Sequence, residues 1–256
     1  MPMLVLRESY FIYVRNLKTW LAQPWMIVAA VLSSAFMFLF FGEPLRGITA
    51  LPGFPADDYQ AFLAAMVIVM AVVFSGSDMA MVLLTDMMSG YVDKLLLSPV
   101  NRFSILLGTL LIGGTRAMAQ VLAIILVATA IGVRFEGGVL GILAVIVGTT
   151  LLGVAMGCVG LIVAMRTRSV QVTVNSWLLF MPLAFLTSAF MPRDLLTGWF
   201  QVAVGLNPIE YIMVAVRAVI IEGWIWDSIL PGIWVLLATT LVLVGAATYE
   251  YRRATN

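Results

Sequence analysis

Long apolar segments dominate this chain and decide what it can fold into. A helix needs about 20 mostly apolar residues to cross the hydrocarbon core of a bilayer. Six segments meet or approach that length: residues 25–42, 59–77, 104–133, 137–165, 170–191 and 229–249. The alternating polarity of a membrane β-barrel is nowhere visible. The sequence therefore predicts an all-α integral membrane protein, with six transmembrane helices in a single transmembrane domain over residues 1–256.

The composition agrees with a membrane location. Hydrophobic residues make up 62% of the chain and charged residues 11%, whereas a soluble domain is about 45–50% apolar and about 25% charged. So large an apolar excess cannot be hidden in one core, because a folded protein of this size still exposes much of its surface.

The residue inventory excludes most catalytic chemistry. The chain has no histidine, one cysteine (Cys158) and only two lysines, Lys18 and Lys94. Zinc sites, Ser-His triads and disulfides need residues that are absent. Neither lysine follows a glycine, so there is no P-loop to hold ATP. We expect no catalytic, metal or cofactor site on this chain, and the net charge of +1 indicates no nucleic-acid partner.

Basic residues predict the orientation, because cytoplasmic loops carry an excess of Lys and Arg. Nine basic residues flank the predicted spans on one side: Arg7, Arg15, Lys18, Lys94, Arg102, Arg166, Arg168, Arg252 and Arg253. Four flank them on the other side: Arg46, Arg134, Arg193 and Arg217. The first set should be cytoplasmic, which places both termini inside.

Residues 4–21, ahead of the first span, form an amphipathic pattern. Aromatic and aliphatic side chains such as Tyr10, Tyr13 and Trp20 share one face, and polar ones such as Glu8 and Arg15 share the other. This pattern favours a helix that lies in the headgroup region. The alternative is an ordinary extension of the first span whose basic side chains reach up to the headgroups.

Between the second and third spans, residues 86–97 are also strongly amphipathic. Asp86, Ser89, Gly90, Asp93 and Lys94 share one face of a helix, and the apolar side chains share the other. Pro99 should end this helix, since proline lacks an N–H group. Two interpretations are open: a helix that transmits a partner's push to the spans, or a loop helix that only packs beneath the bundle.

Three motifs resemble one family. Asp86-Met-Met-Ser-Gly90-Tyr91-Val-Asp93-Lys-Leu95-Leu96-Leu-Ser-Pro99-Val-Asn-Arg102 follows the pattern D/E-x-x-x-G-x-x-[DE]-x-L-x-x-x-P-[VM]-x-R. About 90 residues on come Phe190-Met-Pro192, Gly198-Trp199-Phe200, Asn207-Pro208-Ile-Glu210-Tyr211 and Arg217, and the N-terminus carries Arg7…Arg15-Asn-Leu…Pro24. Together they resemble the permease subunits of ABC type 2 exporters, in particular the daunorubicin-resistance-like branch.

The resemblance implies a half-transporter in the plasma membrane of a prokaryote. Two permease subunits, identical or paralogous, would form the pathway, and two separate ABC ATPase subunits would bind ATP and Mg²⁺ and dock on the coupling helix at residues 86–97. In that helix Gly90 costs roughly 1 kcal/mol relative to alanine, which close approach to a partner could justify. The substrate would be a hydrophobic or amphipathic compound: drug-like, lipid-linked or saccharide-linked.

Residues 192–228 are too interrupted for a clean crossing. Asn207-Pro208 suits a turn into a helix, with asparagine as the cap and proline in the first turn. We predict two short re-entrant helices on the extracellular side, which the family resemblance makes the exit gate (Phe190, Pro192, Asn207, Pro208, Tyr211 and Arg217). Glu210 is too far along the helix to pair directly with Arg217. Arg217 should therefore find another partner, either a second permease across the gate or the headgroups.

Two features lie inside the bundle. Arg116 is mid-span, where a charge costs about 2.5–3.5 kcal/mol, so it should face protein or water and pair with Asp78 at the cytoplasmic end of the second span. A structural ion pair is favoured over a contact in the translocation path. Gly153, Gly157 and Gly160 should let a neighbouring helix of the same chain approach the fourth span closely.

The competing function is an ion-coupled secondary transporter that uses no ATPase. Such proteins are expected to show internal repeats and acidic residues near the middle of the membrane. With the second span ending at Ser77, no acidic residue lies well inside a predicted span, and no repeat between the halves is convincing. The sequence therefore favours the ATP-driven permease.

Overall fold

The computed structural model describes residues 2–42, 44–45, 47, 49, 58–98, 100–189, 193 and 196–255, and for residues 2–4, 26–27, 30, 96 and 255 it describes only the backbone. Every regular element in these ranges is helical. In chain order they are α1 (Pro2–Leu21), α2 (Pro24–Gly42), α3 (Tyr59–Phe74), α4 (Gly76–Met88), α5 (Tyr91–Leu96), α6 (Arg102–Ala130), α7 (Gly138–Thr167), α8 (Val170–Val174), the 3-10 helix η2 (Asn175–Leu179), α9 (Met181–Phe185), α10 (Trp199–Leu206), α11 (Pro208–Ile221) and α12 (Trp226–Thr255).

Several of these helices can cross a membrane. Within the described ranges, four are long and apolar enough: Tyr59–Met88, which joins α3 to α4, and the helices α6, α7 and α12. The pair α10 and α11 passes the same test together although it bends by 82°. Two apolar helices are shorter, Val31–Gly42 and Val170–Phe185. The chain is thus a multi-pass helical membrane protein, while the number of six spans stays a prediction.

The helices of two predicted spans differ from the prediction. The second helix does not end at Ser77 but continues through α4 to Met88, so Asp78 lies within a helix that is long and apolar enough to cross a membrane. The predicted span 170–191 is not one continuous helix, because α8, η2 and α9 succeed one another between residues 170 and 185. Pro182 in the first turn of α9 has no N–H to continue an α-helix from η2.

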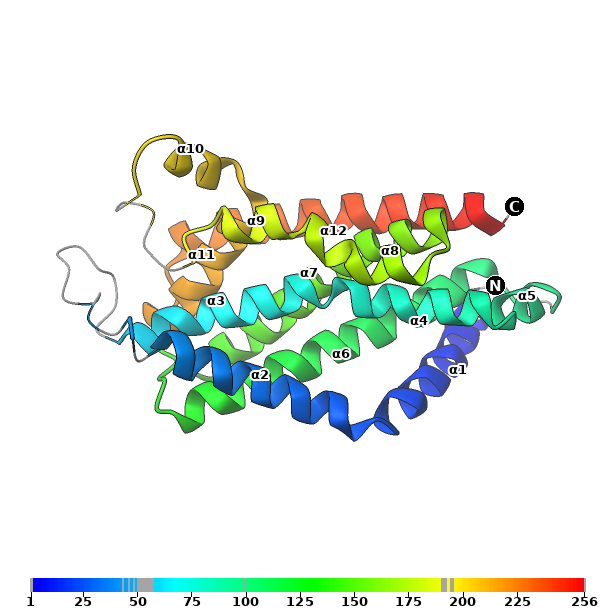
Figure 1. The fold of residues 1–256 in the computed structure, drawn as a ribbon, viewed down its shortest axis with the longest axis horizontal. Coiled ribbons are helices and arrows are strands. Elements are labelled where there is room, and N and C mark those ends of the chain that lie inside the picture. The colour runs from blue at the N-terminus through cyan, green and yellow to red at the C-terminus, as the bar shows by residue number, and fades with distance from the viewer. Residues whose placement is uncertain are drawn as a thin grey trace.

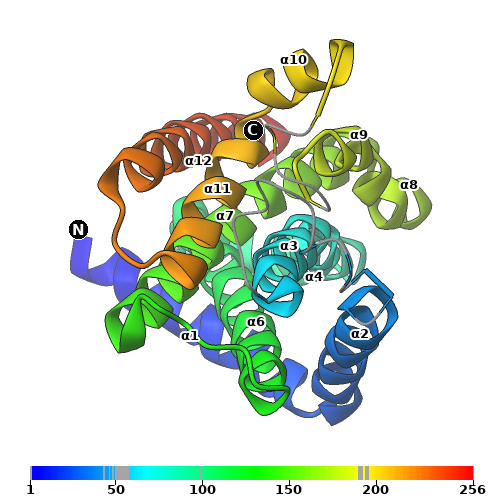
Figure 2. The same ribbon diagram turned by 90° about the vertical axis from the view of Figure 1, so that its left-hand side faces the viewer.

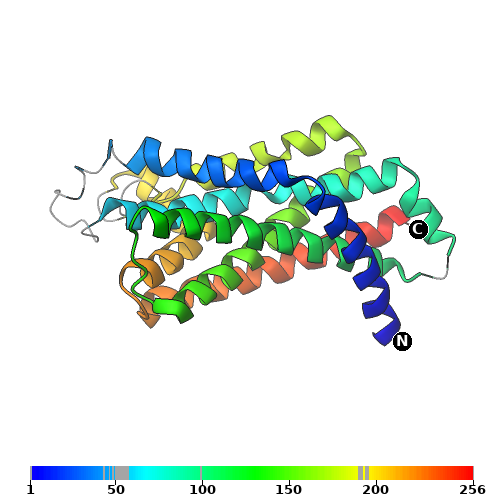
Figure 3. The same cartoon turned by 90° about the horizontal axis from the view of Figure 1, so that it is seen from below.

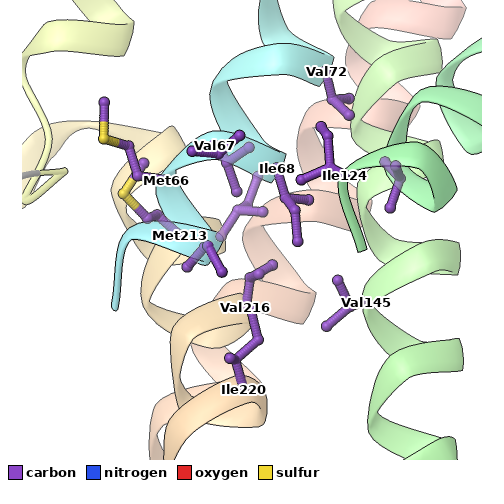
Figure 4. Close-up of a cluster of buried hydrophobic side chains, with 14 of the residues drawn as sticks. Met66, Val67, Ile68, Val72, Ile124, Val145, Met213, Val216 and Ile220 are labelled. Carbon is purple, nitrogen blue, oxygen red and sulfur yellow. The ribbon is translucent and has the colours of Figure 1, made fainter. Parts of the chain in front are cut away.

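The helix α3 forms the centre of the bundle. Figure 2 shows it surrounded by its neighbours, and its side chains from Tyr59 to Val73 are mostly buried. A helix that is apolar on every side belongs in such a position. Figure 4 shows the core around it, where α3 meets α6, α7 and α11 through Met66, Val67, Ile68, Val72, Ile124, Val145, Met213, Val216 and Ile220.

Glycines allow α7 to pack closely against α4. A Cβ atom added to Gly160 would lie 2.8 Å from the carbonyl oxygen of Gly76, and one added to Gly157 would overlap the side chain of Met79. A Cβ atom on Gly153 would lie 2.7 Å from that of Ala117 on α6. The small residues of the fourth span therefore serve packing inside this chain, as the sequence predicted.

The two termini and α5 lie at one end of the elongated bundle, and α10 with the start of α11 lies towards the other (Figure 1). α1 is not parallel to the spanning helices but crosses the bundle obliquely (Figure 3). It packs against α6, where a Cβ atom on Gly108 would lie 2.8 Å from the side chain of Ile12.

The faces of α1 differ from the prediction in one respect. Leu6, Tyr10 and Leu21 are exposed, as expected of side chains that face lipid. Trp20, which the sequence groups with them, is instead buried. The oblique helix therefore contacts both protein and its surroundings with apolar side chains.

Candidate functional site

Residues 86–97, here named the tip segment, do not form the single helix that the sequence predicts. α4 ends at Met88, Gly90 adopts a left-handed conformation with φ of 68°, and α5 begins at Tyr91. A left-handed glycine just after a helix satisfies its last carbonyls and turns the chain away. Gly90 is therefore a helix terminator, and the predicted helical cost of this glycine does not apply.

Arg15 of α1 clamps the start of the tip segment. Its Nη1 donates to Oδ2 of Asp86 at 2.8 Å and its Nη2 donates to Oδ1 at 2.7 Å, a bidentate pair. The guanidinium also lies 3.7 Å from the centre of the Tyr91 ring, on the far side of the Gly90 turn. The hydrogen bonds to Asp86 raise the pKa of Arg15 above its ordinary value, so the guanidinium stays charged.

Glu8 of α1 holds the chain where it leaves the tip segment. Its Oε2 accepts hydrogen bonds from the backbone N–H of Asn101 at 3.0 Å and from the hydroxyl of Ser104 at 2.7 Å. Asn101 in turn caps α6 by accepting from the N–H of Phe103 at 2.9 Å. One oblique helix thus contacts both sides of the tip segment through two charged residues seven positions apart.

The outer surface of the tip segment combines apolar and charged side chains. Met88 and Leu97 are 64% and 90% exposed, and Asp93 and Lys94 are exposed beside them. Val92 is buried and Leu95 half-buried against the bundle. Met88 therefore does not lie on the buried face that a continuous helix predicts, because the turn at Gly90 breaks the helical periodicity.

The remaining predicted residues of this region lie nearby. Met88, Val92 and Asp93 line a cleft of about 240 Å³ together with Arg168, the left-handed residue after α7. Arg102 opens α6 and lines a second cleft with Tyr251 of α12. Pro99 lies outside the described residues, as does the side chain of Leu96.

At the other end of the bundle, Asn207 organises the corner between α10 and α11. Its Oδ1 accepts from the N–H of Ile209 at 3.0 Å, and Pro208 occupies the first turn of α11, as the sequence predicts. Its Nδ2 donates to the carbonyl oxygens of Leu183 and Leu186 at the end of α9. The Tyr211 hydroxyl closes the corner by donating to the carbonyl oxygen of Gly205 at 2.8 Å.

Arg217 finds its partner inside this chain. Its Nη1 donates to the hydroxyl of Ser188 at 3.0 Å and its Nη2 to the Ser188 carbonyl at 2.8 Å, while the N–H of Ser188 donates to Glu210 at 2.7 Å. The guanidinium lies 3.7 Å from the centre of the Phe62 ring. Arg217 is buried among contacts of its own chain, which differs from the expected arginine at the headgroups, and the contact with a second permease stays a prediction. Phe190 and Pro192 of the predicted gate lie outside the described residues.

Arg116 lies between α1 and α4. Its guanidinium is 6.0 Å from the centre of the Trp20 ring, and it acts electrostatically on the carboxylate of Asp78. Among the described residues no hydrogen bond or close ion pair joins the two, so the predicted pair is a longer-range interaction.

The sequence matches a known family. Residues 8–221 match the ABC-2 type transporter family. The chain belongs to this family. It is 22% identical over 230 residues to a protein named as a transport permease, ycf38, of Cyanophora paradoxa, covering 86% of this chain and 77% of that one.

Two further relatives are named for drug resistance. A probable doxorubicin resistance ABC transporter permease protein of Mycobacterium tuberculosis, DrrC, is 25% identical over 189 residues, covering 73% of this chain and 67% of its own. A daunorubicin resistance ABC transporter permease protein of Streptomyces coeruleorubidus, DrrB1, is 23% identical over 160 residues, covering 62% and 55%. The resemblance to the drug-resistance branch of ABC-2 permeases is confirmed.

Members of this family are transmembrane subunits without a nucleotide-binding domain, which agrees with the missing P-loop.

Sequence reasoning missed Glu8 and Ser188 as contact residues within this chain. Glu8 had a signal, because it lies two helical turns from Arg15 and so shares its face. Ser188 had none, since a lone serine in an apolar segment carries no pattern that indicates its partners.

Proposed function

We propose that this chain is the permease subunit of an ATP-driven exporter, and that its ATPase partners dock on the tip segment. Two ABC ATPase subunits, carrying ATP and Mg²⁺, would act on two permeases, each identical to this chain or paralogous. The observation that carries the proposal is a surface of exposed Met88, Asp93, Lys94 and Leu97 on a segment that is anchored on both sides. Exposed apolar side chains beside charged ones are typical of a docking surface.

The anchors explain how docking would move the membrane helices. A displacement of α5 acts on α4 through the short Gly90 turn, and on α1 through Arg15, which touches both Asp86 and Tyr91. Glu8 carries the same displacement to α6. Three helices around the core would therefore respond to one contact.

The proposed orientation follows from charge. The end of the bundle that carries α5 and both termini also carries the larger set of basic residues named from the sequence, such as Lys94, Arg166 and Arg252. By the positive-inside rule this end would be cytoplasmic, in the plasma membrane of a prokaryote. The α10–α11 corner would then face outside as the re-entrant exit gate.

The substrate is proposed from the relatives and the lining of the bundle. Two relatives are named for resistance to doxorubicin and daunorubicin. A hydrophobic or amphipathic compound, drug-like or linked to a lipid or saccharide, would suit a pathway between apolar helices.

One argument against an ion-coupled transporter is weaker, because Asp78 lies within a helix that is long and apolar enough to cross a membrane. Membership of the ABC-2 family replaces that argument.

Replacing Leu97 tests the docking surface. Leu97→Asp places a charge at the most exposed apolar position of the tip segment, and Leu97→Met keeps the apolar surface as a matched control. We expect Leu97→Asp to reduce recovery of the co-purifying ATPase roughly tenfold or more, since an uncompensated charge in an apolar contact costs above about 1.4 kcal/mol. Leu97→Met should assemble normally. Equal recovery from both variants would contradict the proposal.

A further inference from the structure

A cavity opens between α2, α3, α6 and the end of α9. Its volume is about 370 Å³, within the range of small-molecule sites. Most of its lining is apolar and adaptable: Met37, Phe41, Met66, Met70, Phe74 and Phe185. Methionine side chains fill irregular space and accommodate ligands of varied shape.

A band of polar side chains interrupts this lining at one level. Ser33 and Ser34 lie in the middle of α2, Ser75 and Asp78 in the middle third of the helix Tyr59–Met88, and Gln120 in the middle third of α6. Three separate helices therefore present polar groups to the cavity near the middle of their own lengths. The band contains one acidic side chain, Asp78, and no basic one.

Asp78 is poorly compensated at this depth. Within the described part of the chain its carboxylate accepts no hydrogen bond from another side chain, and its side chain is exposed where it lines the cavity. Burial opposes the ionised form of Asp78, and Arg116 favours it from a distance.

Building on the proposed function, we propose that this cavity binds an amphiphilic cation, with the charged group at Asp78 and the apolar body against the methionine and aromatic lining. A lone carboxylate within a membrane-spanning helix is costly. A cation in the cavity would offset that cost through direct contact, which Arg116 does not supply. An anion of the same size would meet repulsion instead, so the site selects by the sign of the charge.

Two probes of equal shape and opposite charge test this selection: tetraphenylphosphonium and tetraphenylborate. Binding of each is measured by equilibrium dialysis on the full-length protein in detergent, and each probe is compared between variants so that its partition into detergent cancels. Asp78→Asn should weaken binding of the cation roughly tenfold or more, as expected when a charged partner is lost. Binding of the anion should stay the same or improve.

Two controls isolate the effect of Asp78. Asp227→Asn removes an equal charge from an exposed position at the start of α12 and should leave both affinities unchanged. Ala71→Phe fills the cavity without changing its charge and should weaken both probes, which keeps the test decisive if Asp78→Asn does not fold. Unchanged cation binding in Asp78→Asn, or in Ala71→Phe, would overturn the proposal.

The Arg116→Gln variant distinguishes a cation-binding site at Asp78 from a pair of charges that only stabilise each other. Under the proposal, Arg116→Gln removes a competing positive charge, so the cation should bind more tightly. If Asp78 and Arg116 only stabilise each other, Arg116→Gln will not strengthen cation binding, and the proposal fails. This assay needs no ATPase, so it can fail independently of the docking test. If Leu97→Asp loses the ATPase but still binds the cation, both proposals are supported. If Leu97→Asp loses the ATPase but the protein binds cation and anion equally, only the cavity assignment is rejected.

Discussion

Two arginines at opposite ends of the bundle make nearly the same contacts in different surroundings. Arg15 and Arg217 each lie 3.7 Å from the centre of an aromatic ring, Tyr91 and Phe62 respectively. Each also has an acidic neighbour, Asp86 in one case and Glu210 in the other. The side chain of Arg15 is 40% exposed and that of Asp86 13%, whereas Arg217 is buried.

The difference in burial assigns different roles to the two ends. Around Arg217, a charge removed from solvent ties α11 to the segment after α9 through Ser188, and breaking one partner leaves the others without compensation. Around Arg15, solvent screens the charges, so the contact can rearrange at modest cost. The α5 end is therefore suited to movement with a partner, and the α10–α11 end to holding a fixed arrangement.

The largest expected effect is at Arg217. Arg217→Met keeps the apolar contact with Phe62 but leaves Glu210 and the Ser188 carbonyl buried without the guanidinium. Leaving buried acceptors without their charged hydrogen-bond donor costs about 1.5–3 kcal/mol. We expect a clear fall in the thermal unfolding temperature of the purified protein in detergent.

A second substitution serves as the control for this prediction. Adding Glu210→Gln to Arg217→Met removes the uncompensated charge and should recover part of the lost stability. If the unfolding temperature of Arg217→Met falls no further than that of Arg15→Gln, the two ends do not differ in the way proposed.

A smaller effect is expected at Arg15 and Asp86. A double-mutant cycle with Arg15→Gln and Asp86→Asn should give a coupling energy of about 1–2 kcal/mol, because the bonds are bidentate but Arg15 is screened by solvent. Unfolding in detergent measures the coupling energy. ATP hydrolysis and transport by the assembled complex then show whether the pair links the two activities. Both single variants should uncouple hydrolysis from transport while the complex still assembles. A coupling energy as large as that at Arg217 would contradict the screening argument.

The sequence predicts the features of both ends that depend on neighbouring residues. Asn207-Pro208 was identified because a cap and a first-turn proline act within a few residues of each other, and the structure places the bend there. The membrane character follows from apolar length alone. The family motif located the tip segment, but the single helix predicted for that segment was wrong.

The features that the sequence did not predict depend on distant contacts. The sequence predicted that Arg116 acts on Asp78 but not that the helix around Asp78 continues from α3 through α4 to Met88. The interruption of residues 170–185 was missed because the segment was judged by its total length and apolar content, although Gln171, Thr173, Asn175, Ser176 and Pro182 interrupt its apolar run. Gly90 was placed inside a helix because hydrophobic periodicity does not reveal a left-handed residue, which only the fold of the surrounding chain requires.

The smallest expected effect compares two glycines at opposite ends of the bundle. Gly90 and Gly138 have φ values of 68° and 62°, and a Cβ atom added to either would meet nothing within 4 Å. Replacement of either by alanine should therefore cost a similar amount, about 1 kcal/mol from backbone strain alone. Unfolding in detergent should show equal, small losses. Gly90 lies in the turn between α4 and α5, so Gly90→Ala should also alter the ATP hydrolysis rate of the assembled transporter, whereas Gly138→Ala should not. If both variants change hydrolysis equally, the tip segment has no special part in coupling, and the functional difference between the two ends must have another origin.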